Sequence, residues 1–195
     1  MNLLVTGGYG FIASNFINYY FPKNKNNLNV LVNIDCLYYA ANKNNINEEI
    51  KKDEKYIFIK SNINNTDLVS YVLDKYNITH IIHFAAQTAV DASFHNSLQY
   101  TKDNVLATHC LLEDCRVYGK LKKFIHVSTD EVYGDSSLDD KIPKNERSVL
   151  CPNNPYSATK AAAEMIVGSY LRCYNMPIII TRGNNVYGPN HYPEK

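Results

Sequence analysis

The chain has 195 residues and a mass of 22.2 kDa, enough for one domain with a buried core. Hydrophobic residues make up 45% of it and charged residues 20%, proportions that exclude a disordered, collagen-like or acidic-tail protein. The 20 Lys and Arg residues nearly balance the 19 Asp and Glu residues, which gives a formal net charge of +1. A charge this small favours a small-molecule partner over nucleic acid or an anionic membrane.

Short apolar runs rich in β-branched residues alternate with longer stretches of helical pattern along the chain. This alternation is typical of βαβ units and predicts an α/β fold with a doubly wound parallel sheet of about six strands. The predicted strands are Leu3–Thr6, Val30–Asp35, Tyr56–Ile59, His80–Phe84, Phe124–Ser128 and Ile178–Arg182. The predicted helices are Phe11–Tyr20, Asp67–Tyr76, Ser97–Tyr118 and Tyr156–Tyr174, and the long irregular segments are Tyr39–Glu49 and Gly134–Asn154.

The cysteines and the N-terminus indicate where the protein works. The chain has 5 cysteines, an odd number without CxxC spacing, so neither a disulfide framework nor a thiolate zinc site is expected. No cluster of His, Cys and Asp has metal-ligand spacing, and no metal is expected. The N-terminus lacks a signal-peptide pattern, and no window approaches the roughly 18 apolar residues of a membrane span. We expect a soluble, unprocessed, cytoplasmic protein without a membrane partner.

Glycines follow the first predicted strand directly, in the segment Gly7-Gly8-Tyr9-Gly10-Phe11-Ile12-Ala13. In this arrangement Gly7 permits a tight turn, and Gly10 lets the backbone approach a pyrophosphate that the following helix N-terminus also attracts. A strand-to-helix turn with spare glycines is the alternative. Asp35 ends the second strand about 25 residues after Gly10, where a carboxylate can accept both ribose hydroxyls and repel a 2′-phosphate. These features predict a Rossmann-like domain that binds NAD.

Polar residues end the fifth predicted strand, at the sheet edge where open α/β folds place their ligands. Thr129 supplies a hydroxyl there, and Asp130 and Glu131 supply two carboxyl groups that can act as general acid and general base. An N-cap followed by a solvated turn is the alternative for the same residue types.

Tyr156 and Lys160 are spaced i, i+4 on the last predicted helix, so the phenol and the ammonium lie one turn apart on one face. A cation at this position favours the phenolate. We therefore expect the pKa of Tyr156 to be lowered from about 10 toward neutrality, which suits a general base.

Several segments carry a family resemblance: TGGYGFIAS, HFAAQTAVD, HVSTDEVYG, NPYSATKAAAE and RGNNVYGPN. Together they resemble the extended short-chain dehydrogenase/reductase family, specifically its nucleotide-sugar 4,6-dehydratases. STDEVYG is the most telling, because epimerases and most other family members lack an Asp-Glu pair after the Ser-Thr. In sequence, the segments HFAAQT, PYSATKAAAE and RGNNVYGPN are most similar to the dehydratase portion of UDP-rhamnose synthases, which act on UDP-glucose. The resemblance covers essentially the whole chain.

The resemblance implies a lyase that uses tightly held NAD+ catalytically and converts UDP-glucose to UDP-4-keto-6-deoxyglucose, in UDP-rhamnose biosynthesis. Tyr156 would take the proton of the sugar 4-hydroxyl while hydride leaves C4, and Lys160 would lower the Tyr156 pKa and bind the nicotinamide ribose. Glu131 would then take the C5 proton and Asp130 would protonate the departing C6 hydroxyl. Thr129 would hydrogen-bond the sugar at O4, and hydride would return to C6.

Further site positions are carried over from the resemblance. The implied NAD-binding residues are Gly7, Gly10, Phe11, Ile12, Asp35, Asn62, Ile63, Ala85, Ala86, Thr101, Tyr156, Lys160 and Val186. The implied substrate-binding residues are Thr88, Thr129, Asn185 and Lys195. Asn62 stands where relatives usually have an Asp near the adenine, and it keeps a hydrogen-bonding side chain without the charge.

Dehydratase relatives continue beyond the position of Lys195 into a C-terminal lobe that binds the nucleotide. Residues 1–195 are therefore expected to form an NAD-binding domain with the catalytic residues, and to lack the substrate-binding lobe. Three alternatives stay open: a dTDP-glucose 4,6-dehydratase, a non-catalytic NAD-binding module, and a nucleotide-sugar epimerase, in which Asp130 and Glu131 would have no role. Because full-length relatives often dimerise through two long helices, we expect a homodimer with a four-helix interface formed by Ser97–Tyr118 and Tyr156–Tyr174.

Overall fold

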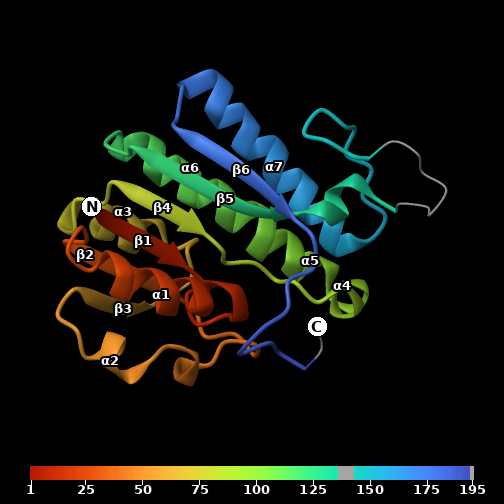
Figure 1. Ribbon diagram of the computed structural model, residues 1–195. Coiled ribbons are helices and arrows are strands. Elements are labelled where there is room, and N and C mark those ends of the chain that lie inside the picture. The colour runs from red at the N-terminus through yellow and green to blue at the C-terminus, as the bar shows by residue number, and fades with distance from the viewer. Residues whose placement is uncertain (136–142, 194–195) are drawn as a thin grey trace.

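A computed structural model describes residues 1–135 and 143–193 of the chain. One sheet of six parallel strands runs through this part of the molecule, with helices on both faces (Figure 1). The strands are β1 (Asn2–Thr6), β2 (Val30–Asp35), β3 (Tyr56–Lys60), β4 (His80–His83), β5 (Lys123–Thr129) and β6 (Ile178–Gly183). The predicted doubly wound parallel sheet is confirmed, and each strand begins and ends within one residue of its predicted bounds.

The helices agree with the prediction less closely than the strands do. They are α1 (Phe11–Asn24), α2 (Glu48–Lys51), α3 (Thr66–Lys75), α4 (Val90–His95), α5 (Ser97–Tyr100), α6 (Ala107–Tyr118) and α7 (Pro155–Tyr174), with the short helical turns η1 (Lys43–Asn45), η2 (Thr101–Leu106) and η3 (Asp130–Tyr133). The single helix predicted over Ser97–Tyr118 is divided, because η2 is a π-helical turn between α5 and α6. Helix α4 was not predicted, since six residues are too few to show an apolar period.

The strand order β3-β2-β1-β4-β5-β6 places the first strand at the centre of the sheet. The chain adds β2 and β3 on one side of β1, and then β4, β5 and β6 on the other. Connections on the two sides leave β1 and β4 in opposite directions, so a crevice opens at the carboxyl ends of these two strands. The fold therefore fixes where a ligand can enter the edge of the sheet.

The core lies on both faces of the sheet because alternate residues of each strand point to opposite sides. Leu3 and Val5 of β1 belong to a cluster with Ile17 of α1. Leu4, between them, belongs to a second cluster with Leu111 of α6. Burial on both faces explains why the strands appear as continuous apolar runs in the sequence.

Two histidines of β4 lie in different surroundings, as their odd spacing on a strand predicts. His83 is buried and contacts the hydroxyls of Thr6 and Thr108, whereas His80 is half-buried at the start of the strand. Within residues 1–135 and 143–193, no group of three or more His, Cys, Asp or Glu side chains is arranged to hold a metal ion. No helix in the same residues is long and apolar enough to cross a membrane.

Candidate functional site

A cavity of about 1000 Å³ opens at the carboxyl end of the sheet. Residues from the ends of β1, β2, β4, β5 and β6, and from the loops that follow them, form its wall, as expected for a ligand site in an open α/β sheet. The structure brings most of the predicted site residues together around this cavity. They are Gly7, Gly10, Phe11, Ile12, Asp35, Asn62, Ile63, Ala85, Ala86, Thr88, Thr129, Glu131, Tyr156, Lys160, Asn185 and Val186.

The remaining predicted site residues lie elsewhere. Thr101 is exposed at the start of the π-helical turn, and its hydroxyl donates to the carbonyl oxygen of Ser97 at 3.3 Å. It is Asp103, two residues later in that turn, that reaches the cavity. Asp130 sits between two lining residues without lining the cavity itself, and its Oδ1 accepts a hydrogen bond of 3.3 Å from the Thr129 hydroxyl. Lys195 lies outside the described residues.

The loop between β1 and α1 is built so that backbone forms the cavity wall. Gly7 has a φ of +71°, and a Cβ atom there would lie 2.8 Å from the Cα atom of Ala85. Only glycine fits both the left-handed conformation and this close approach. Gly10 is the N-cap of α1 and offers no side-chain cap, so the first N–H groups of the helix are left for a ligand.

Asp35 closes this loop from the end of β2. It is 6% exposed, and its two oxygens accept hydrogen bonds from the N–H groups of Tyr9 (2.9 Å) and Leu37 (2.7 Å). Burial raises the pKa of this carboxyl group, while the two backbone hydrogen bonds act in the opposite direction. Each oxygen keeps a second lone pair, so the carboxylate can hold the loop and still accept from a ligand in the cavity.

The turn after β5 carries the predicted acid and base. Thr129 is the N-cap of η3, and its hydroxyl oxygen accepts from the Glu131 N–H at 3.3 Å. Thr129 therefore has the N-cap role that was the alternative to a catalytic one. It also lines the cavity, so the two roles are compatible. The carboxylate of Glu131 accepts a hydrogen bond of 3.4 Å from the side-chain amide of Asn154, which connects the turn to the start of α7.

Helix α7 begins at a strong N-terminal signal. Asn154 and Ser157 form a capping box, and Pro155 occupies the first helical turn, where its missing N–H costs nothing. The cap fixes where the helix starts, and with it the positions of Tyr156 and Lys160 one turn apart. Both side chains are buried against the cavity.

The pKa values of Tyr156 and Lys160 reflect burial, which the sequence-based prediction did not include. Burial lowers the pKa of Lys160 to about 8, and its Nζ donates to the carbonyl oxygen of Val127 at 2.8 Å. The pKa of Tyr156 is raised by burial and by the negative charge of Glu131, although a hydrogen bond with Thr129 acts in the opposite direction. The expected lowering of the Tyr156 pKa is therefore not found, because the loss of solvent around the phenol outweighs the favourable contacts.

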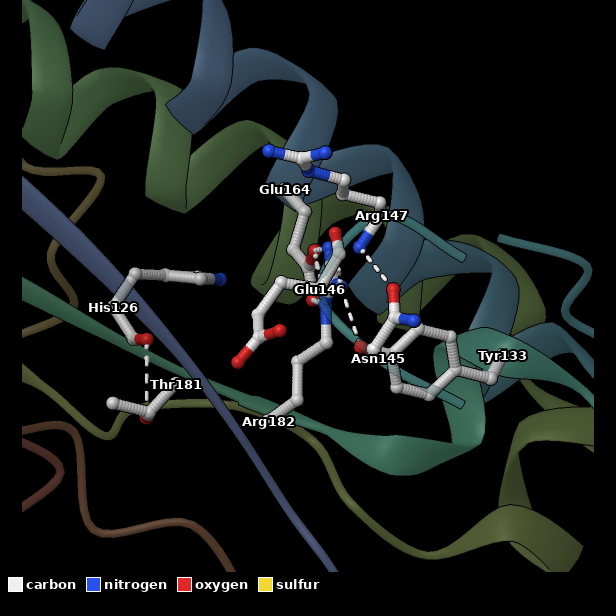
Figure 2. A network of polar contacts seen from close by, with 8 residues as sticks. All are labelled: His126, Tyr133, Asn145, Glu146, Arg147, Glu164, Thr181 and Arg182. Atoms are coloured by element: carbon white, nitrogen blue, oxygen red, sulfur yellow. Dashed lines mark hydrogen bonds and ion pairs between the residues drawn. The ribbon is translucent and has the colours of Figure 1, made fainter. Parts of the chain in front are cut away.

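A buried polar network beside this site is not evident from the sequence (Figure 2). Glu164 of α7 pairs with Arg182 of β6 at 2.7 Å, and Arg182 also donates to the Tyr133 hydroxyl of η3 at 2.7 Å. One signal was available: Glu164 follows Lys160 by four residues, so a second charged residue lies on the buried face of α7.

The chain is similar to known proteins in both sequence and fold. Over 194 residues it is 50% identical to an Arabidopsis thaliana trifunctional UDP-glucose 4,6-dehydratase/UDP-4-keto-6-deoxy-D-glucose 3,5-epimerase/UDP-4-keto-L-rhamnose-reductase, with 100% of this chain and 29% of that protein covered. A dTDP-D-glucose 4,6-dehydratase of Dictyostelium discoideum is 46% identical over 202 residues, which cover 99% of this chain and 45% of that protein. A crystal structure of dTDP-glucose 4,6-dehydratase from Streptomyces venezuelae with NAD bound superposes with a TM-score of 0.92 at 36% identity, covering 100% of this chain and 59% of that one.

The chain thus spans less than half the length of both curated relatives. Residues 4–195, nearly the whole sequence, match a protein family described as GDP-mannose 4,6 dehydratase. The likenesses in sequence and fold agree with this match. The chain belongs to the GDP-mannose 4,6 dehydratase family.

Proposed function

We propose that this chain is the NAD-binding and catalytic part of a UDP-glucose 4,6-dehydratase, with residues 1–195 forming one domain. One observation carries the proposal: Thr129, Glu131, Tyr156 and Lys160 line the same cavity as the glycine loop. A binding loop, a base and a Tyr-Lys pair around one space are the groups that oxidation at C4 and elimination across C5 and C6 require. The family membership and the Arabidopsis relative support it.

The residues around the cavity fit NAD. The left-handed Gly7 and the bare N-terminus of α1 form a cradle for the pyrophosphate that any Cβ at Gly7 would fill. Asp35 would hold the adenosine ribose, with Asn62 and Ile63 near the adenine and Lys160 near the nicotinamide ribose. When bound, NAD supplies a hydride acceptor for C4 of the sugar and later a hydride donor for C6.

The chain's own residues manage the protons of the reaction. As the phenolate, Tyr156 takes the proton from the 4-hydroxyl. Burial raises the pKa of Tyr156, so this phenolate needs positive charge nearby, which Lys160, largely charged at neutral pH with a pKa of about 8, and the nicotinamide ring of bound NAD+ would supply. Glu131 takes the C5 proton that the 4-ketone acidifies, and Asp130 protonates the C6 hydroxyl as it leaves. One water leaves, and the net product is UDP-4-keto-6-deoxyglucose with no net change in oxidation state.

The proposal favours UDP-glucose because the Arabidopsis relative, whose name specifies it, shares the higher identity with this chain. dTDP-glucose is the second candidate, supported by the Dictyostelium relative. The test is incubation of the protein with NAD+ and either sugar nucleotide, followed by the alkali-induced ultraviolet absorbance of the 4-keto product. We expect the larger kcat/KM with UDP-glucose, and a larger value with dTDP-glucose would reverse the assignment.

Two other classes of function make different predictions in the same assay. A non-catalytic module would bind NAD by calorimetry without turnover, and failure to bind NAD would contradict both that function and the dehydratase. A nucleotide-sugar epimerase would be little affected by Glu131→Gln, whereas a dehydratase should lose elimination. Asp130 and Glu131 favour the dehydratase, since epimerisation leaves them without a role.

We also propose that the protein is a homodimer in the cytoplasm. Apolar side chains are exposed on the helices that the four-helix interface would use, namely Leu98, Leu106, Val117, Met165 and Leu171. All five cysteines are free, as suits a reducing compartment. Light scattering should give twice the monomer mass, and a monomer at high concentration would refute the dimer.

A further inference from the structure

Arg182 contacts three parts of the chain whose relative positions matter for the proposed chemistry (Figure 2). Its Nε donates to both carboxylate oxygens of Glu164 at 3.2 and 3.0 Å, and its Nη2 donates to Oε2 at 2.7 Å. Its Nη1 donates to the Tyr133 hydroxyl at 2.7 Å and to the carbonyl oxygen of Glu146 at 3.4 Å. One guanidinium on β6 thus contacts α7, the end of η3 and the segment before α7.

Burial makes this arrangement rigid. The Glu164 side chain is 2% exposed and that of Arg182 is 18% exposed. A forked guanidinium on a buried carboxylate has a single good geometry, and loss of either partner leaves an uncompensated charge. Because Glu164 fixes the fork of Arg182, the remaining Nη1 is aimed at Tyr133.

The network lies between the two groups of proposed catalytic residues. Glu164 follows Tyr156 and Lys160 at intervals of four residues along α7, so the three share one helix face. Tyr133 is the last residue of η3, the turn that begins with Asp130 and Glu131. The parallel pairing of β5 with β6 brings Arg182 opposite Ser128, next to the start of that turn. The network therefore spans from the Tyr-Lys face to the acid-base turn.

We propose that Arg182 and Glu164 are positioning residues that act through Tyr133 to hold the Asp130–Glu131 turn in place relative to Tyr156 and Lys160. The inference rests on the proposed function, which gives that turn its role. Asn154 already connects Glu131 to the start of α7, and the network adds a second connection almost three turns further along the helix. Two connections fix the orientation of the turn as well as its distance. Misplacement of a catalytic group by about 1 Å can cost on the order of 100-fold in rate.

The central variant is Tyr133→Phe, because Tyr133 does not line the cavity and loses only a hydroxyl. We expect kcat for 4-keto product to fall about 10- to 100-fold with KM changed less than about 3-fold. Backbone amides of residues 130–134 should exchange with deuterium about tenfold faster, with α7 and the NAD affinity unchanged. Tyr71→Phe, the same change at an exposed position of α3, is the control and should leave all these quantities as in the wild type.

Conservative variants separate positioning from charge. Arg182→Lys keeps the charge but loses the forked contact with Glu164. We therefore expect the amides of residues 130–134 to exchange with deuterium as fast as in Tyr133→Phe. Glu164→Asp, which keeps the negative charge, should recover part of the kcat and exchange protection that Glu164→Gln loses.

Two results would overturn the positioning role. One is a Tyr133→Phe protein with wild-type kcat and wild-type exchange in residues 130–134. The other is faster exchange spread evenly over the chain, which would indicate general destabilisation. If the wild-type protein dehydrates neither sugar nucleotide, the proposed function fails, and exchange and NAD calorimetry on the same variants still decide whether the network holds the turn.

Discussion

The Nζ atom of Lys160 donates a hydrogen bond of 2.8 Å to the carbonyl oxygen of Val127, which anchors α7 to the end of β5. Thr129 follows Val127 by two residues and η3 begins at the next residue, so this bond sets the Tyr-Lys helix beside the acid-base turn. The same bond occupies a buried ammonium whose pKa burial lowers to about 8. The positive charge of Lys160 is thus buried at a position where an uncharged side chain would make the fold more stable.

Removal of that charge should stabilise the fold. The pKa of Lys160 is about 8 in the folded protein against 10.5 for an ordinary lysine, so below pH 8 the protonated side chain disfavours folding. Between pH 8 and 10.5 only the unfolded chain keeps the proton, and the penalty fades as the pH rises. Lys160→Met also loses the hydrogen bond to Val127, so we expect a net gain of about 1–2 kcal/mol in unfolding free energy at pH 7.

Urea unfolding at pH 7 and at pH 10.5 measures this effect. The gain should shrink at the higher pH, and the variant should make no 4-keto product at either. Lys102→Met, at an exposed position of η2, is the control and should change the unfolding free energy little. A Lys160→Met protein less stable than the wild type at pH 7 would contradict the burial penalty.

Two glycine-to-alanine variants should have opposite effects. At Gly7 the added Cβ would meet backbone at 2.8 Å in a left-handed conformation, so Gly7→Ala should lower the unfolding free energy by about 1–3 kcal/mol and remove NAD binding. At Gly168, inside α7, nothing lies within 4 Å, so Gly168→Ala should raise it by about 0.5–1 kcal/mol. Thermal unfolding and calorimetric titration with NAD test both, and equal behaviour of the two variants would count against the cradle.

Asp35→Asn should weaken NAD binding and loosen the loop. An amide offers one acceptor where Asp35 offers two, so the N–H of Tyr9 or Leu37 loses its partner at a cost of about 1–3 kcal/mol. We expect a loss of NAD affinity of at least about tenfold and a smaller preference for NAD over NADP. Calorimetry with both dinucleotides measures it, with Asp74→Asn in an exposed ion pair as the control. An unchanged ratio of the affinities for NAD and NADP would show that Asp35 does not contact the adenosine ribose.

Tyr156→Phe should separate chemistry from binding. The phenol is the proposed base for the 4-hydroxyl, so kcat should fall by at least about 100-fold while the NAD affinity changes less than about 3-fold. Tyr170→Phe, at another buried phenol of the same helix, controls for the loss of a hydroxyl. If both variants lost activity equally, the effect would be one of helix packing.

The sheet and the place of the cavity at its edge could be predicted because they depend on local patterns. Apolar runs marked the strands, and Gly7, Asp35 and Thr129 were found because the carboxyl ends of parallel strands converge on one edge. The contact between Tyr133 and Arg182 joins residues 49 positions apart and exists only because β5 pairs with β6. The raised pKa of Tyr156 likewise depends on burial, which a helical spacing cannot predict. Thr101, a residue predicted to bind NAD, lies in the π-helical turn that the sequence does not predict, and it does not line the cavity.

The most direct test of the account follows one hydrogen atom. The protein, alone and fused to the C-terminal remainder of the dehydratase region of the Arabidopsis relative, is incubated with NAD+ and UDP-glucose deuterated at C4. We expect a 4-keto-6-deoxy product with the deuterium in its 6-methyl group, and no such product from the Glu131→Gln variant. NAD binding of ordinary affinity with no 4-keto product from either form of the protein would contradict it.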